Sequence, residues 1–126
     1  MKIIINGSTM IPIYQQIVDQ IKELIIKGEL KENDNLPSVR SLASELKISA
    51  LTVKKAYDIL DSEGFTVTIH GKGSFINSTN KELLLEEQEK EIEKLLATTI
   101  SKAKTYKISR NDLEEVFKLL VEEQYD

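Results

Sequence analysis

The sequence contains no cysteine and only one histidine, His70. The lack of cysteine excludes a disulfide scaffold, a cysteine nucleophile and a thiolate metal site. A single histidine excludes any site that needs two imidazoles. No apolar run approaches the roughly 18 residues of a membrane span, and residues 1–6 lack the length and cleavage pattern of a signal peptide. We therefore expect a soluble, cytoplasmic protein with no membrane partner.

Motifs for catalysis are also missing. The chain has no Ser-His-Asp set, no glycine-rich phosphate loop before a helix, and no acidic metal cluster with matching histidines. The segment Gly71-Lys72-Gly73 is too short for a phosphate loop, and its flanks predict a hairpin. We expect neither enzymatic activity nor a cofactor or metal.

The charge of the chain is unevenly distributed. The net charge of −4 over 126 residues argues at first against nucleic acid. Residues 1–79, however, hold nine basic and nine acidic residues, so the excess lies entirely in residues 80–126. The segment Ser38–Ala56 has four bases and one acid. Such a patch can bind DNA on a neutral domain, although a solvated helix face would give the same cluster.

The first half of the chain predicts three helices. After a short strand or arm over residues 1–8, a helix is expected from Thr9 to Lys27, with Pro12 in its first turn. Two further helices are expected over about 39–46 and 50–63, capped by Ser38 and Ser49. Four residues of the third helix share an apolar face at helical spacing: Val53, Ala56, Tyr57 and Leu60.

The apolar period then changes from 3.6 to 2. Residues 65–70 alternate as in a strand, the Gly71-Lys72-Gly73 turn follows, and Ser74-Phe75-Ile76 returns. Two helices with a short joint and then a hairpin are typical of a winged helix-turn-helix. We predict a mainly α fold with a small β-wing, a polar joint over residues 77–80, and two domains, 1–77 and 78–126.

The C-terminal part predicts two amphipathic helices, from Lys81 to about Thr105 and after a capping serine, Ser109. In the last helix, four residues are expected to face inward: Leu113, Val116, Phe117 and Leu120. Two such helices cannot bury both apolar stripes alone, which favours a dimerisation tail. The candidate dimerisation residues are Leu85, Ile92, Leu96, Phe117 and Leu120. A ligand pocket on the same stripe is the alternative, and an effector site would then lie between subunits.

Several motifs in residues 12–76 resemble a known family. They are Pro12-Ile13-Tyr14-Gln15-Gln16-Ile17, Leu36-Pro37-Ser38-Val39-Arg40-Ser41-Leu42-Ala43, Thr52-Val53-Lys54-Lys55-Ala56-Tyr57 and Gly71-Lys72-Gly73-Ser74-Phe75-Ile76. Together they resemble the DNA-binding domain of GntR-family transcriptional regulators, over about 65 of 126 residues. The short two-helix tail is similar to that of the YtrA subfamily. This resemblance implies a dimeric repressor, often of a transport operon.

The resemblance also implies DNA contacts by Arg40 and by residues at the start of the third helix. Those residues are Ser49, Thr52 and Lys54, and His70 and Gly71 match the wing tip that reaches the minor groove. From their chemistry we add Ser38, Leu51, Lys55 and Lys72 as DNA-binding candidates. Two departures stand out: Ala50 and Leu51 occupy positions that are often polar or basic, and Ile69 replaces a frequent wing arginine.

Each assignment has an alternative. Arg40 could instead form a surface ion pair with Glu45 or Glu63, and the serines and Thr52 could be helix caps alone. For the whole chain, we expect a homodimeric repressor that binds a palindromic site on double-stranded DNA. The alternative is a winged-helix module for protein–protein interaction without specific DNA binding.

Overall fold

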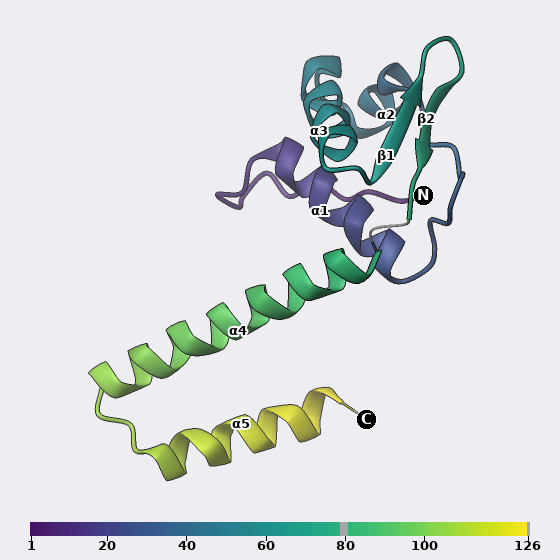
Figure 1. Cartoon of the computed structure of the whole chain (residues 1–126). Coiled ribbons are helices and arrows are strands. Elements are labelled where there is room, and N and C mark those ends of the chain that lie inside the picture. Colours follow the sequence, from purple (N-terminus) through teal and green to yellow (C-terminus); the bar gives the residue numbers. More distant parts are fainter. Residues whose placement is uncertain (79–80, 126) are drawn as a thin grey trace. The chain divides into compact units, whose positions relative to one another are not determined.

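The structure is a computed structural model that describes residues 1–78 and 81–125. In the described chain, three helices are followed by an antiparallel hairpin and then two more helices (Figure 1). Two compact units are present, Met1–Leu85 and Glu86–Asp126. The predicted fold class, a mainly α chain with a winged helix-turn-helix followed by helices, is confirmed. No helix in the described ranges has the length and apolar character needed to cross a bilayer.

Helix α1 (Ile13–Ile26) begins later than the sequence predicts. The expected start was Thr9, with Pro12 in the first turn. In the structure Pro12 is the N-cap residue, and its carbonyl accepts hydrogen bonds from the N–H groups of Gln15 and Gln16 at 3.0 and 3.1 Å. Because a residue that precedes proline is disfavoured in helical conformation, Ile11 cannot extend the helix backward.

Residues 1–8 form an arm and not a strand. The side-chain amide of Gln20 accepts from the N–H of Ile4 and donates to its carbonyl, at 2.9 and 2.7 Å. Gln16 makes the same pair of bonds with the backbone of Asn6, at 2.8 and 2.9 Å. Two glutamine side chains one turn apart on α1 therefore bond the backbone of the arm in place of the hydrogen bonds that a neighbouring strand would make.

Helices α2 (Val39–Leu46) and α3 (Ala50–Ser62) form the helix-turn-helix. The predicted caps are confirmed: the Oγ of Ser38 accepts from the N–H of Ser41 at 3.0 Å, and the Oγ of Ser49 accepts from the N–H of Thr52 at 3.1 Å. Lys47 closes the connection in the left-handed region, with φ of 57°. The short joint thus fixes the direction in which α3 leaves α2.

The core of the first unit is built on the inner face of α3. Its members are fully buried apolar side chains from all three helices and from the hairpin, including Ile17, Ile21, Ile25, Leu42, Val53, Leu60 and Ile76. Tyr57 also lies inside, and its hydroxyl donates to the carbonyl of Pro37 at 2.8 Å. Burial raises the pKa of Tyr57 well above its ordinary value. The predicted inner face of α3 is confirmed.

The wing consists of β1 (Thr66–Ile69) and β2 (Gly73–Ile76), paired antiparallel from Thr66 with Ile76 to Ile69 with Gly73. The alternating apolar residues of β1 face outward, since Val67 and Ile69 are 48% and 45% exposed. Thr66, on the same strand, is buried. The other edge of β2 is bonded to the segment 33–36, for which no strand is predicted from the sequence. The N–H of Leu36, for example, donates to the carbonyl of Ser74 at 2.8 Å.

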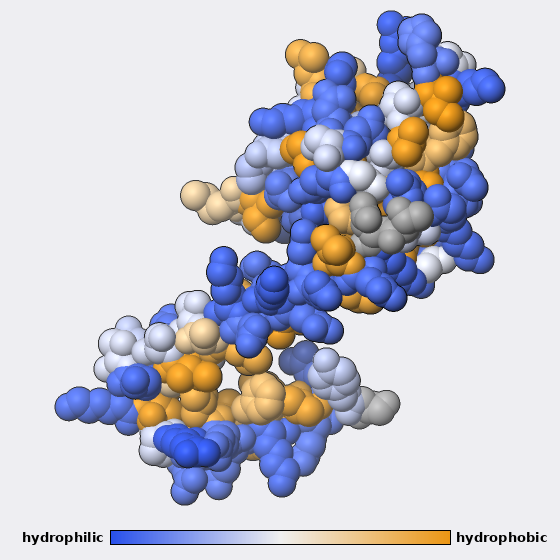
Figure 2. Space-filling model, in the orientation of Figure 1, coloured by the Kyte–Doolittle hydropathy of each residue, from blue (hydrophilic) through white to orange (hydrophobic). Residues whose placement is uncertain are grey.

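The second unit contains most of α4 (Lys81–Thr105) and all of α5 (Arg110–Gln124). The predicted cap of α5 is confirmed, because the Oγ of Ser109 accepts from the N–H of Asp112 at 3.1 Å. Apolar side chains gather on the facing sides of the two helices (Figure 2). They remain largely uncovered: Phe117 is 52% exposed and Ile92 is 58% exposed. The face of α5 predicted to be inward is therefore not buried within the chain.

The start of α4 belongs to the first unit. Leu84 is fully buried and joins the core of the winged helix. Just before it, the N–H and the hydroxyl of Ser78 donate to the carboxylate of Glu32 at 2.5 and 2.7 Å, which holds the pKa of Glu32 below its ordinary value. The predicted polar joint includes Thr79 and Asn80, which lie outside the described residues. The boundary after residue 77 stays a prediction.

We expect Leu84→Ala to lower the free energy of unfolding of the first unit by about 2–5 kcal/mol, because it leaves a cavity in a closed core. Its neighbour Leu83 is 61% exposed, so Leu83→Ala should change stability by only about 0.5 kcal/mol. Urea unfolding followed by circular dichroism measures both. Equal effects of the two variants would show that α4 does not begin inside this core.

Candidate nucleic-acid interface

The first turn of α3 lies at the surface of the helix-turn-helix. Leu51 is 79% exposed, and Ser49 lies beside it at the surface. Thr52 is half-buried, and its hydroxyl lies 3.0 Å from the Oγ of Ser49. Both residues thus serve the cap, while the Ser49 hydroxyl is still open to solvent. The structure places these three predicted residues together at one helix end.

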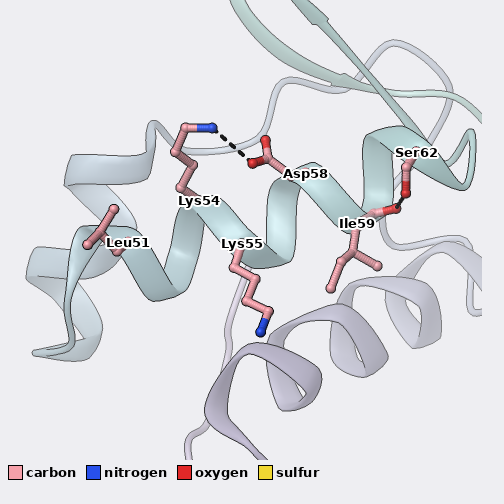
Figure 3. A pocket seen from close by; sticks show the side chains of 6 residues that line it. All are labelled: Leu51, Lys54, Lys55, Asp58, Ile59 and Ser62. Carbon is pink, nitrogen blue, oxygen red and sulfur yellow. Dashed lines mark hydrogen bonds and ion pairs between the residues drawn. The ribbon is translucent and has the colours of Figure 1, made fainter.

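The two lysines of α3 point in different directions. In Figure 3, Lys55 extends toward α1 and Lys54 extends to the opposite side of α3. The Nζ of Lys55 lies 4.0 Å from the centre of the Tyr14 ring, a cation–π contact. The Nζ of Lys54 pairs with the carboxylate of Asp58 at 2.9 Å. Lys54 is held by an exposed ion pair that is easily exchanged, whereas Lys55 packs on a neighbouring helix.

Arg40 lies exposed in the first turn of α2, one helix away from the α3 cluster. Within residues 1–78 and 81–125, its guanidinium forms no ion pair with Glu45 or Glu63. Glu63 instead binds Lys22, with 2.9 Å between Nζ and Oε2. The guanidinium of Arg40 is therefore available for a ligand from outside this chain.

At the wing tip, His70, Gly71 and Lys72 are all exposed. Gly71 has φ of 79°, and the N–H of Lys72 donates to the carbonyl of Ile69 at 2.9 Å, which closes the turn. Glycine suits this position because it adopts a positive φ without the strain that a Cβ would bring.

A groove of about 310 Å³ runs between the wing and the start of α2. It brings Lys72 and Ser38 together, with the hydroxyls of Thr68 and Ser74 along its wall. A second hollow, of about 480 Å³, follows the outer side of α3 and is lined by Leu51, Lys54 and Lys55 (Figure 3). Arg40 and His70 line neither hollow. The predicted residues thus lie on three neighbouring elements of one domain and not in one enclosed site.

Two residues of this surface were not predicted from the sequence. Asp58 follows Lys54 by four positions, and this helical spacing is a signal that could have revealed the ion pair. Tyr14 is separated from Lys55 by 41 positions, so no local pattern links them. Only the crossing of α1 and α3 brings them into contact.

The surface is one of a winged helix with an exposed α3 start and a basic wing tip, the class of fold used by DNA-binding regulators. Residues 13–76 match the family model described as bacterial regulatory proteins, gntR family. The chain belongs to the GntR family, a class of regulatory proteins and not of enzymes. The predicted resemblance is confirmed.

One curated relative is the HTH-type transcriptional repressor YtrA of Bacillus subtilis. It is 44% identical over 82 residues, which cover 65% of this chain and 63% of the relative. This chain therefore matches less than two thirds of the length of that repressor.

Solved structures support the same assignment. A transcriptional regulator from Oenococcus oeni has a TM-score of 0.75 and 29% identity, over 93% of this chain and 97% of that one. The DNA-binding domain of AraR, crystallised in complex with operator ORR3, has a TM-score of 0.52 and 25% identity, over 61% of this chain and 93% of that one. The AraR domain is thus a similar fold seen on DNA.

The contact between Lys55 and Tyr14 should contribute about 0.5–1 kcal/mol to stability. A double-mutant cycle with Tyr14→Ala and Lys55→Ala, measured by urea unfolding, gives this coupling energy. The matched cycle with Tyr14→Ala and Lys54→Ala should be additive within about 0.5 kcal/mol, because Lys54 points away from α1. Equal coupling in the two cycles would contradict the arrangement of the lysines.

Proposed function

We propose that this chain is a sequence-specific DNA-binding transcriptional regulator, acting in the cytoplasm as a homodimeric repressor of a palindromic operator. The observation that carries the proposal is the uncovered first turn of α3 in a domain of the GntR family, where Leu51 is 79% exposed. A large apolar side chain held in solvent at a helix start is suited to contact a thymine methyl in the major groove. The AraR domain, of similar fold, was crystallised with operator DNA.

Each candidate has a chemical role in this proposal. Arg40 offers a planar guanidinium for guanine or phosphate, and this role is supported by its lack of an ion pair within residues 1–78 and 81–125. Ser49 and Thr52 offer hydroxyls to base edges, and Ser38 offers one at the start of α2. Lys54 and Lys55 reach phosphates, and for Lys54 this requires exchange of its pair with Asp58.

The wing supplies a second point of contact in this proposal. His70 and Lys72 lie at the tip, and Gly71 lets the backbone approach a groove closely. Ile69 lies where the family often has arginine, so we expect electrostatic attraction at the wing to come mainly from Lys72.

The second unit is proposed to form the dimer interface. Four of its apolar side chains are between 42% and 58% exposed in the single chain: Ile92, Leu96, Phe117 and Leu120. Leu85, at the end of the first unit, is 39% exposed and extends this surface. Exposed apolar surface of this extent is typical of an association site. A two-fold axis through paired tails would present two α3 helices to half-sites separated by one or more turns of DNA.

A small-molecule effector is not required by this proposal. The hollow between α4 and α5 measures about 240 Å³ and is lined by apolar side chains such as Leu96, Ile100 and Phe117. Ligand sites commonly exceed roughly 300 Å³, so an effector site here would need walls from a second copy. The resemblance to the YtrA subfamily implies a transport operon as the first target to test, and the repressor YtrA is one relative with a similar domain.

Selection of bound duplexes from a random pool should yield a palindromic sequence. On that duplex, we expect Arg40→Ala and Thr52→Ala each to lower affinity by about 10- to 100-fold, the scale of one lost base contact. Fluorescence anisotropy at fixed salt measures the affinities. The control is Lys27→Ala, at the end of α1 that is farthest from Tyr14, which should bind as the parent does. Failure to retain any duplex at low salt would favour the protein-interaction module.

We expect Phe117→Glu to convert the dimer into a monomer, because it places a charge on the uncovered apolar face of α5. Sedimentation equilibrium measures the mass. The matched control is Lys118→Glu, one position further round the same helix, which should remain dimeric. A dimer that survives Phe117→Glu, Ile92→Glu and Leu96→Glu alike would place the interface elsewhere.

A further inference from the structure

A chain of polar contacts connects the last turn of α3 to both strands of the wing. One carboxylate oxygen of Asp61 accepts the hydroxyl of Thr66, and the other accepts the hydroxyl of Thr68 at 2.6 Å. The Thr68 hydroxyl also lies 2.8 Å from the Oγ of Ser74 on β2. Since β1 lies against α3, this chain crosses from the helix to the far strand (Figure 1).

Apolar packing alone holds only the base of the wing. Phe65 and Ile76 are buried there, but Val67 and Ile69 face outward and are nearly half exposed. The strands have four residues each, and an isolated hairpin of that size is at best marginally stable in water. The direction of the tip relative to α3 therefore depends on polar contacts.

The segment 33–36 supports the wing on its other edge. The N–H of Ile76 donates to the carbonyl of Asp34, and the N–H of Leu36 donates to the carbonyl of Ser74, both at 2.8 Å. These backbone bonds hold β2 at one edge, but they do not link it to α3. At the base of the wing, the N–H of Phe65 donates to the carbonyl of Leu60 at 2.9 Å. In the described chain, the side-chain link from α3 to the strands of the wing is made by Asp61.

We propose that Asp61 is a positioning residue that fixes the wing relative to α3, so that the two elements meet DNA as one rigid unit. The inference rests on the proposed DNA-binding function. A carboxylate suits this place because it only accepts hydrogen bonds and its two oxygens can serve two hydroxyls at once. Bonds to an ionised acceptor are also roughly twice as strong as neutral ones.

For removal of Asp61, the proposal predicts a change in DNA affinity that is opposite in sign to the change expected from charge alone. Asp61 is negative, and its removal lessens the repulsion between α3 and phosphates, which by itself strengthens DNA binding. A positioning role predicts weaker binding, because the wing tip is no longer directed. Asp58 is the matched control: it lies three positions earlier on α3, carries the same charge, and binds Lys54.

The experiment measures affinity for the selected duplex by anisotropy. We expect Asp61→Ala to bind about fivefold to tenfold more weakly, the lower end of the scale for one lost contact, because the wing is misdirected and not removed. Asp58→Ala should bind as tightly as the parent or tighter. Lys72→Ala should weaken DNA binding when introduced into the parent. In the Asp61→Ala background it should have little further effect on affinity, since the wing no longer contributes to binding. Tighter binding by both carboxylate variants would overturn the proposal.

Loss of Asp61 leaves the buried hydroxyl of Thr66 without its acceptor, which can destabilise the fold. Thr68→Val is therefore the second variant, because it removes an exposed hydroxyl from the link while Thr66 keeps its bond. It should also weaken binding, with unfolding unchanged in urea. Unchanged affinity in Thr68→Val and in folded Asp61→Ala would refute the positioning role.

A readout without DNA separates this inference from the proposed function. Amide hydrogen exchange at residues 68–74 should be faster in Asp61→Ala and Thr68→Val than in Asp58→Ala, whether or not the chain binds a duplex. If the parent binds no DNA, the proposed function fails, and exchange still decides whether Asp61 holds the wing. Unaltered exchange alongside normal DNA binding by the parent rejects the Asp61 inference alone.

Discussion

The burial of one face of α3 sets the arrangement of the first unit. A helix has a fixed angle between successive side chains, so the burial of Val53, Tyr57 and Leu60 leaves Leu51 and Lys54 outside. The Tyr57 hydroxyl, bonded to the carbonyl of Pro37, also ties this helix to the start of α2. The orientation of α3 and the place of the α2 terminus are therefore set by the same buried side chains.

Local patterns in the sequence predicted those parts of the fold that local forces determine. Ser38 and Ser49 cap their helices as expected, because a serine before an apolar period satisfies free N–H groups. The predicted start of α1 at Thr9 was wrong, because proline disfavours a helical conformation in the residue before it and this effect outweighed the apolar pattern. The pairing of segment 33–36 with β2 was not predicted, because it joins backbone groups about forty positions apart.

The candidate site divides in the same way. The exposure of Leu51 and Arg40 follows from helical spacing and could be predicted, although their contacts with DNA stay predictions. The partners of the charged side chains could be predicted only where they lie one turn apart, as for Lys54 and Asp58. Tyr14 beneath Lys55 and the hydroxyls around Asp61 depend on how separate elements cross, and residue type alone does not encode that.

The burial of Leu84 matters to anyone who would build chimeric regulators from this chain. A domain cut at the end of the hairpin would lack the Leu84 side chain and would have a cavity in its core. The tail joined to it would have to supply an apolar side chain that fills this cavity. A graft should therefore keep the opening turn of α4 with the winged helix and exchange only what comes after Leu85. The helix that leads into the tail is, for its first turn, still part of the domain that precedes it.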